Sequence, residues 1–156
     1  MGKQLDRDPL DALFGSMEQP HSSLAEGRDR AELDIDKLIP FSNHPFRLYE
    51  GDRMADMVES IRDNGVMVPI IVRRGADDRY EILAGHNRMQ AAKQAGLMTV
   101  PAIIREGISD DDALIIVTES NTHQRSLSDM LPSELAKALQ MQLEAYKRMK
   151  RRGVYV

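Results

Sequence analysis

Cysteine and tryptophan are absent from this 156-residue sequence, and aromatic residues make up only 4% of it. The lack of cysteine excludes disulfide bonds, thiolate metal sites and cysteine nucleophiles. The sequence also has no apolar run long enough to span a bilayer and no signal-peptide core near its start. We therefore expect a cytoplasmic protein with no membrane partner, whose core is built from Leu, Ile, Val and Met.

The net charge is small but unevenly distributed. With 21 basic and 25 acidic side chains, the chain carries −4 at pH 7, which argues against the whole chain being a nucleic-acid clamp. Residues 1–34 hold four basic and eight acidic side chains, whereas residues 137–152 hold six basic and one acidic. A polyanionic partner is therefore expected to meet the C-terminal end.

Composition and hydrophobic periodicity divide the chain into three regions. Residues 1–31 are polar and aperiodic, which predicts a disordered or weakly ordered leader. Residues 32–126 alternate between strand-like and helix-like patterns and predict one domain. Residues 127–156 contain Pro132, a residue typical of a helix start, and predict one further helix.

The middle region predicts a mixture of strands and helices. Met54, Met57, Val58 and Ile61 recur at helical spacing, so residues 52–64 are expected to form a helix with one apolar stripe. The other expected elements are a short strand and turn over 33–40, a hairpin of strands 69–73 and 80–83, a short helix over 89–95, a strand over 100–105 and a buried helix from Ser109 to about His123. The last helix would carry one apolar face, formed by Leu135, Leu139, Leu143 and Tyr146.

These elements alternate without a regular strand–helix–strand rhythm. The predicted fold class is therefore α+β: a small mixed β-sheet with packed helices, followed by a C-terminal helix.

One polar segment, Gly85-His86-Asn87-Arg88, follows the second hairpin strand and leads into a helix. Glycine lets the backbone approach a ligand closely, and the free N–H groups of a helix start favour an anion such as phosphate. Arg88 adds a charged fork suited to phosphate oxygens. A tight turn with an exposed arginine explains the same four residues, and is favoured when they are considered alone.

Two other polar segments carry an arginine. A proline-stiffened loop over 43–47 could hold Arg47 near a phosphate, and Glu119 and Asn121 offer oxygen ligands for a hydrated Mg²⁺, with Arg125 beside them. Considered alone, the first segment is more often a turn with a solvated arginine. The second is more often a polar helix end that its own side chains cap.

The order of these segments resembles the ParB family, the centromere-binding proteins of bacterial chromosome and plasmid segregation. The resemblance covers about residues 33–140. Its densest part is Tyr80-Glu81-Ile82-Leu83-Ala84-Gly85-His86-Asn87-Arg88-Met89-Gln90-Ala91-Ala92, followed by Val100-Pro101-Ala102-Ile103-Ile104. The long ordered run is specific to the family, whereas the single motifs are not.

The resemblance implies a sulfiredoxin-like fold and a dimeric, cytoplasmic, nucleoid-associated protein. Proteins of this family bind CTP with Mg²⁺ in this domain, close into a clamp on DNA and reopen after slow hydrolysis. DNA and a ParA-type ATPase are the implied partners, and residues 127–156 become the first helix of a truncated helix-turn-helix region. By position, the candidates for binding CTP or another nucleoside triphosphate are Arg47, Gly85, His86, Asn87, Arg88, Asn121 and Arg125, and those for holding the metal are Glu119 and Asn121.

Departures from the family pattern bear on hydrolysis. The common Gly-Glu-Arg-Arg loop reads Gly-His-Asn-Arg at 85–88, the common Gln-Pro-Arg reads Pro-Phe-Arg at 45–47, and the acidic box over 119–125 carries extra spacing. With one arginine fewer, we expect nucleotide binding to weaken by ~1–3 kcal/mol. Without the glutamine, we expect weak or absent CTP hydrolysis.

Two alternatives to a nucleotide switch remain open at this point. One is an ATP-dependent phosphotransferase that resembles the free serine kinase of the same fold family, with Glu81 or Glu119 as its base. The other is an interaction module that binds no nucleotide.

Overall fold

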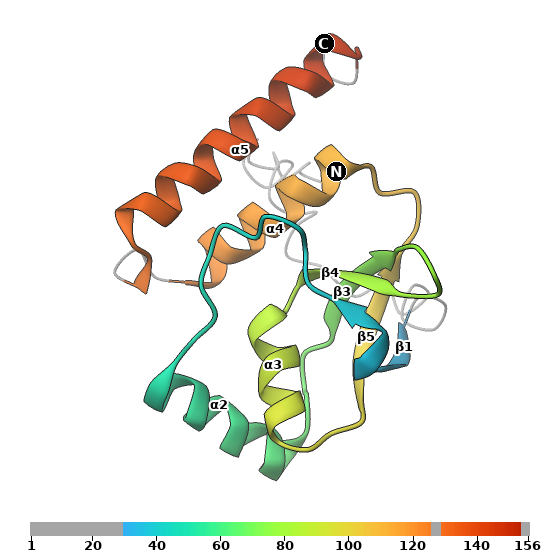
Figure 1. Ribbon diagram of the computed structural model, residues 1–156, viewed down its shortest axis with the longest axis vertical. Coiled ribbons are helices and arrows are strands. Elements are labelled where there is room, and N and C mark those ends of the chain that lie inside the picture. The colour runs from blue at the N-terminus through green and yellow to red at the C-terminus, as the bar shows by residue number, and fades with distance from the viewer. Residues whose placement is uncertain (1–29, 126–128, 154–156) are drawn as a thin grey trace, which may run out of the picture. The chain divides into compact units, whose positions relative to one another are not determined.

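The computed structural model describes residues 30–125 and 129–153, which form a five-stranded mixed sheet with helices on both faces (Figure 1). The expected α+β fold with a C-terminal helix is confirmed. The strands are β1 (Arg30–Asp34), β2 (Leu38–Ile39), β3 (Ile70–Arg74), β4 (Tyr80–Ala84) and β5 (Thr99–Arg105). The helices are the short 3-10 helix η1 (Ile35–Lys37), α2 (Gly51–Asn64), α3 (His86–Gln94), α4 (Asp110–Gln124) and α5 (Pro132–Arg151).

The sheet has the strand order β1-β5-β3-β4-β2. β3 and β4 form the expected antiparallel hairpin, joined by a turn in which Asp77 and Asp78 take positive φ. β5 runs parallel to β3, and β2 runs parallel to β4 at the edge. The predicted leader, residues 1–31, lies outside the described residues except for its last two, which already belong to β1.

The two faces of the sheet carry two separate cores, because successive residues of a strand point to opposite sides. Ile70, Val72 and Ile82 are fully buried in the core that α2 and α3 complete. Their strand neighbours Ile71 and Leu83 pack instead in the core formed with α4. Burying one side chain of this size stabilises the folded state by roughly 1.5–3 kcal/mol. Because β3 and β4 contribute side chains to both cores, the helices on both faces pack against the same central strands.

Two helices begin and end as the sequence predicts. α2 buries Met54, Val58 and Ile61 and ends at Gly65, whose φ of 71° is one that glycine adopts freely. α4 starts after Ser109, whose hydroxyl accepts a hydrogen bond from the Asp112 N–H at 3.1 Å. The Asp112 carboxylate accepts the Ser109 N–H in return, which completes a capping box.

The start of α3 corrects the prediction. The helix begins at His86 rather than Met89, so three of the four residues expected to form a loop make up its first turn. Gly85 is the N-cap, with φ 98°, and its carbonyl accepts the first helical hydrogen bond from the Met89 N–H at 2.9 Å. The left-handed backbone of this glycine lets the chain turn from β4 directly into the helix.

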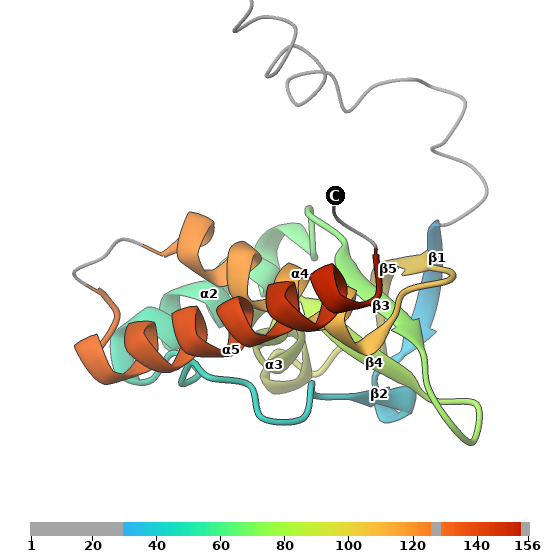
Figure 2. The ribbon, with the colours of Figure 1, turned by 90° about the horizontal axis from the view of Figure 1, so that it is seen from above.

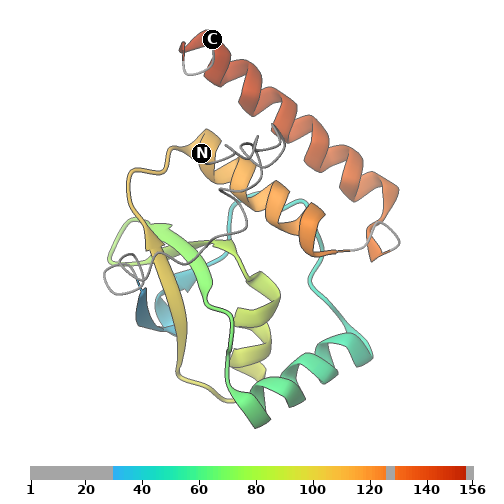
Figure 3. The same cartoon turned by 180° about the vertical axis from the view of Figure 1, so that it is seen from behind.

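α5 lies beside α4 and away from the sheet (Figures 1 to 3). Its buried face is formed by Ala138, Ala145 and Met149, whereas Leu139 and Leu143 are 52% and 55% exposed. The predicted apolar face is therefore only partly buried: Leu135 packs against the cluster of Phe46, Met130 and Ala138, and Tyr146 donates to Glu119 on α4, whereas the two middle leucines are exposed.

Polar contacts complete the α4–α5 interface. The buried Asp111 accepts a hydrogen bond from Arg148 Nε at 2.8 Å and forms an ion pair with Arg152 at 3.3 Å. α4 itself is buried mainly along Ala113, Val117 and Thr118, so the expectation of a buried helix holds for one side of it.

None of the helices within the described residues is both long and apolar enough to cross a membrane.

Candidate functional site

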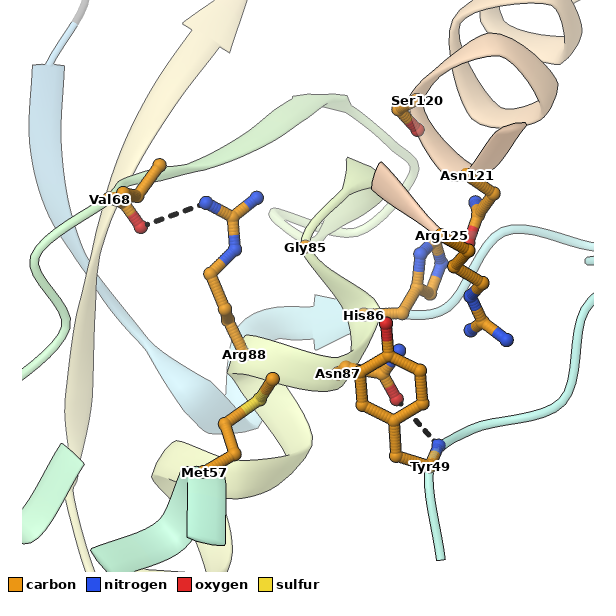
Figure 4. A pocket seen from close by; sticks show the side chains of 10 residues that line it. All are labelled: Tyr49, Met57, Val68, Gly85, His86, Asn87, Arg88, Ser120, Asn121 and Arg125. Carbon is orange, nitrogen blue, oxygen red and sulfur yellow. Dashed lines mark hydrogen bonds between the residues drawn. The ribbon is translucent and has the colours of Figure 1, made fainter. Parts of the chain in front are cut away.

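A cavity of about 350 Å³ lies where the start of α3, the end of α4 and the loop before α2 meet (Figure 4). Its lining residues are Tyr49, Met57, Val68, Gly85, His86, Asn87, Arg88, Ser120, Asn121 and Arg125. The fold thus brings six of the seven predicted nucleotide-binding residues into one place: Gly85, His86, Asn87, Arg88, Asn121 and Arg125. None of the described residues that line the cavity is acidic.

The N-terminus of α3 gives the cavity a positive electrostatic character. The first N–H groups of a helix have no partner within the helix, and the helix dipole makes that end positive. The first turn of α3 holds no acidic residue, whereas those of α2, α4 and α5 hold Asp52, the run Asp110–Asp112 and Glu134. Gly85 also has no side chain to cap these N–H groups. An anion in the cavity would therefore take the place of the missing acidic partner.

Gly85 is required here for space as well as for backbone conformation. A Cβ on this residue would lie 2.6 Å from Ile70 Cγ2 and 2.9 Å from Arg88 Nη2. Since the Ile70 side chain is fully buried, it has little room to move away. The absence of a side chain at Gly85 therefore also leaves room for the Arg88 guanidinium to lie against the Gly85 backbone.

Two arginines supply cationic groups. Arg88 donates from Nη1 to the Val68 carbonyl at 3.2 Å, and burial lowers its pKa without discharging the guanidinium at neutral pH. Arg125 is only 7% exposed and donates to the Arg47 carbonyl at 2.8 Å. Burial lowers the pKa of Arg125 too, while the nearby Tyr49 raises it, and the guanidinium carbon lies 4.7 Å from the Tyr49 ring centroid. The cavity is thus positively charged at both ends.

Arg47 is the predicted nucleotide-binding residue that the structure does not bring into the cavity. Its side chain is 64% exposed and pairs through Nε with Glu134 Oε1 at 2.9 Å. The same carboxylate oxygen accepts the Arg47 backbone N–H at 3.1 Å. The Arg47 backbone carbonyl therefore helps to hold Arg125, a cavity residue, while the Arg47 guanidinium binds Glu134 in the first turn of α5.

Of the two predicted metal-holding residues, one lines the cavity. Asn121 does, but the Glu119 carboxylate accepts hydrogen bonds from Gln142 at 3.3 Å and the Tyr146 hydroxyl at 3.2 Å, both on α5. No group of three or more His, Asp or Glu side chains able to hold a metal ion occurs within the described parts of the chain. An oxygen ligand such as Asn121 fits a hydrated Mg²⁺ that a phosphate also coordinates, but it does not make a metal cage by itself.

Two histidines, His86 in the cavity lining and His44 behind it, pack against each other. His86 is 7% exposed, and its Nε2 accepts the Phe41 N–H at 3.1 Å, so the ring proton sits on Nδ1. Burial, followed by the nearness of His44 and Arg125, lowers the pKa of His86 to about 3. The rings of His44 and His86 lie 4.2 Å apart. Burial also lowers the pKa of His44, so both imidazoles are neutral at neutral pH.

Asn87 ties the loop before α2 to the start of α3. Its Oδ1 accepts the Tyr49 N–H at 2.8 Å, as the dashed line in Figure 4 shows. The carboxamide therefore positions Tyr49 in the wall.

Sequence reasoning missed several residues of the cavity and its walls. Tyr49, Met57, Val68 and Ser120 carry no motif that would have singled them out. His44, which contacts Asn121 and His86, was missed as well, and the signal for it is its place in the same short loop as Arg47.

The chain matches the family model of the ParB N-terminal domain over residues 6–122. The probable chromosome 1-partitioning protein ParB of Deinococcus radiodurans is 34% identical over 136 residues, covering 86% of this chain and 45% of that protein. The nucleoid occlusion protein of Listeria monocytogenes is 33% identical over 139 residues, covering 87% of this chain and 48% of that protein. The chain thus spans about half the length of these curated relatives.

Two solved structures of C-terminally truncated chromosome-partitioning protein ParB from Caulobacter crescentus are similar to this one. The complex with CTP-gamma-S has a TM-score of 0.58 and 35% sequence identity, over 64% of this chain and 56% of that chain. The complex with the centromeric parS site has a TM-score of 0.55 and 26% identity, over 81% of this chain and 59% of that chain.

Proposed function

Since this chain belongs to the ParB N-terminal domain family, we propose that it is the nucleotide-binding switch domain of a ParB-like DNA-partition protein. The observation that carries the proposal is the cavity itself. It combines the uncapped N-terminus of α3 with Arg88 and Arg125, and no described lining residue is acidic. Such a site favours a ligand with several negative charges, as a triphosphate has.

The phosphates would lie against the first turn of α3. The N–H groups of His86, Asn87 and Arg88 would donate to phosphate oxygens, with the Arg88 guanidinium on one side and Arg125 on the other. A volume of about 350 Å³ lies within the usual range for small-molecule sites. CTP is the nucleotide we propose, because the similar Caulobacter protein was solved with CTP-gamma-S.

Magnesium would reach the phosphates from the α4 side. Asn121 supplies an oxygen ligand there, and Mg²⁺ would neutralise part of the triphosphate charge when bound. The Glu119 carboxylate could bind the metal only if its hydrogen bonds with Gln142 and Tyr146 on α5 were broken, so Glu119 is the weaker of the two metal-ligand candidates in this conformation.

We extend the proposal to DNA, because the similar Caulobacter protein was solved with its centromeric parS site. A ParA-type ATPase, a second copy of the chain and a place in the cytoplasm at the nucleoid are proposed from the family resemblance alone. Residues 32–126 would be the nucleotide-binding domain, and 127–156 the first helix of a helix-turn-helix region. Since sequence readout needs a recognition helix in the major groove, we expect this 156-residue chain to bind DNA weakly and without sequence preference.

A mobility-shift series with one cognate and several scrambled duplexes tests the DNA-binding expectation. Binding should be equal for all duplexes and should fall steeply between two salt concentrations. A salt-resistant preference for one duplex would show that the folded core itself reads DNA.

Hydrolysis of CTP is expected to be weak or absent. Pro45 and Phe46 stand where the family commonly has a glutamine, and the Asn87 carboxamide is engaged by the Tyr49 N–H. Phosphate release measured on the full-length protein with its cognate DNA tests this expectation, and a rate typical of the family would contradict it.

No observation favours the phosphotransferase alternative. Glu119 contacts α5, and Glu81 pairs with Arg73 at 2.7 Å outside the cavity. Neither carboxylate is therefore placed to act as a base on a ligand in the cavity.

Titration calorimetry with CTP, ATP and GTP in the presence of Mg²⁺ tests nucleotide binding directly. Arg88→Ala should lower CTP affinity by about 10- to 100-fold, the scale of a hydrogen bond to a charged group. Arg105→Ala is the matched control, because Arg105 is exposed and lies outside the cavity. Both variants should melt within a few degrees of the wild type.

Two results would contradict the proposal. If Arg88→Ala unfolds the domain and affinity follows the remaining folded fraction, Arg88 is structural. If the wild type binds none of the three nucleotides, the chain is an interaction module.

A further inference from the structure

Asn121 lines the cavity, and one end of its carboxamide is held by the chain. Its Nδ2 donates to the Val117 carbonyl, one helical turn earlier, at 2.8 Å. The reverse orientation would place two oxygens at that distance, so the Val117 carbonyl determines which end of the amide is nitrogen. Among the described residues, none donates a hydrogen bond to Oδ1. The oxygen is therefore the end of the amide that remains available.

His44 engages the nitrogen end of the same amide. Its Nε2 lies 3.4 Å from Asn121 Nδ2, so Nε2 must be the unprotonated, accepting nitrogen. Its Nδ1 lies 2.7 Å from the Phe46 carbonyl oxygen and must carry the proton, because a bare nitrogen that close to an oxygen would be repelled. The Phe46 N–H is also near Nδ1, at 3.3 Å, but the shorter contact decides the protonation. His44 is thus expected as the Nδ1–H tautomer.

His86 prevents the His44 ring from turning away. The two rings lie 4.2 Å apart, and His86 is fixed in turn by the Phe41 N–H on its Nε2. His44 is therefore held between the backbone of its own loop, the first residue of α3 and the end of α4.

We propose that His44 is a positioning residue of the cavity, which reinforces the orientation that the Val117 carbonyl gives the Asn121 carboxamide, with its oxygen toward the bound ligand. This inference rests on the proposed nucleotide site and deepens it. An oxygen acceptor serves the metal of a nucleotide–Mg²⁺ complex, or a water on that metal, whereas an amide NH₂ would serve the phosphates. His44 would thus act on the metal-dependent part of nucleotide affinity.

The first test needs no ligand. Long-range ¹⁵N–¹H spectra of the labelled chain distinguish the two neutral histidine tautomers, and His44 should show the Nδ1–H form. The Nε2–H form would overturn the proposal, because a protonated Nε2 cannot accept a hydrogen bond from Asn121 Nδ2, and His44 would then not hold the amide.

The second test compares two variants that each keep one half of the imidazole. In His44→Gln the end of the side chain stands where Nε2 stood and can accept from Asn121. In His44→Asn it stands where Nδ1 stood and cannot reach Asn121. The measured quantity is the gain in CTP affinity when Mg²⁺ replaces EDTA. We expect about a 5- to 10-fold smaller gain in His44→Asn, the scale of one hydrogen bond, and recovery of most of it in His44→Gln.

Controls separate this role from general stabilisation. Affinity in EDTA should be the same in both variants and the wild type. His123→Asn, an exposed histidine on the same helix whose ring contacts the Glu119 carbonyl, should leave the Mg²⁺ gain unchanged.

Equal losses in His44→Gln and His44→Asn, or no loss in either, would overturn the positioning role while nucleotide binding stands. A wild type that binds CTP with no Mg²⁺ gain would overturn it too. A wild type that binds no nucleotide would overturn both proposals.

Discussion

Gly85→Ala should destabilise this domain by more than a left-handed glycine alone would explain. Gly85 has a φ of 98° and stands between β4 and α3, where an added Cβ would lie 2.6 Å from the buried Ile70 Cγ2. Gly96, at the other end of α3, has a similar φ of 85° but nothing within 4 Å of its added Cβ. The two alanine variants therefore share the backbone strain and differ in the steric clash.

The expected magnitudes follow from these two terms. An alanine in the left-handed region costs roughly 1–2 kcal/mol, which is the whole expected effect of Gly96→Ala. Overpacking a filled core costs typically ~1–3 kcal/mol more, because Ile70 has no room to move. Gly85→Ala should therefore lower the free energy of unfolding by about 2–5 kcal/mol in total.

Urea unfolding monitored by circular dichroism, with both variants and the wild type analysed by linear extrapolation, measures the difference. If Gly85→Ala and Gly96→Ala lose the same stability, the contact with Ile70 does not constrain the start of α3. The reasoning that ties Arg88 to a side-chain-free Gly85 would then be wrong.

Three further predictions concern α5 and its contacts. Burial alone would raise the pKa of Glu134, but hydrogen bonds from two backbone N–H groups and a guanidinium outweigh it and lower the pKa. Its stabilisation is therefore present above the unfolded-state pKa and lost as pH falls through the lower folded-state value. Glu134→Gln should cost about 1–3 kcal/mol at pH 7 and flatten the stability profile below about pH 5, and an unchanged profile in acid titration melts would contradict this. Asp111→Asn should lower the free energy of unfolding by about 1–3 kcal/mol and speed amide hydrogen exchange throughout α5, because Arg148 and Arg152 lose their carboxylate partner. Exchange equal to that of the wild type would show that these ion pairs do not hold α5 against α4. Leu139→Ser should change stability by less than about 0.5 kcal/mol, whereas Ala145→Leu should cost about 1–3 kcal/mol, and the reverse order in urea unfolding would show that Leu139, and not Ala145, lies on the buried side of α5.

Local patterns in the sequence predicted the elements that depend on neighbouring residues. The apolar stripe of α2, the β3–β4 hairpin and the Ser109 cap of α4 each arise from interactions across a few residues. The candidate site could also be predicted in part, because the resemblance to a family carried the positions of Gly85 to Arg88, Asn121 and Arg125. These residues line one cavity, and their role in binding nucleotide stays a prediction.

The sequence could not predict orientations that long-range contacts determine. Glu119 was expected at the metal and Arg47 at a phosphate, but α5 offers both of them partners in this conformation. The buried face of α5 includes Ala138, Ala145 and Met149 and only part of the predicted leucine stripe, a difference that helical periodicity alone cannot show.

The same limit applies to the starting point of α3 and to His44. Only the packing of Ile70 against Gly85 shows why the helix begins where it does, and only the Val117 carbonyl shows which way Asn121 faces. The sequence by itself thus determined the elements, their class and the residue types of the site, because those depend on short-range propensity and pattern. The tertiary structure decided which of those side chains reach the cavity, because Glu119 and Arg47 are held by α5 residues more than twenty positions away along the chain.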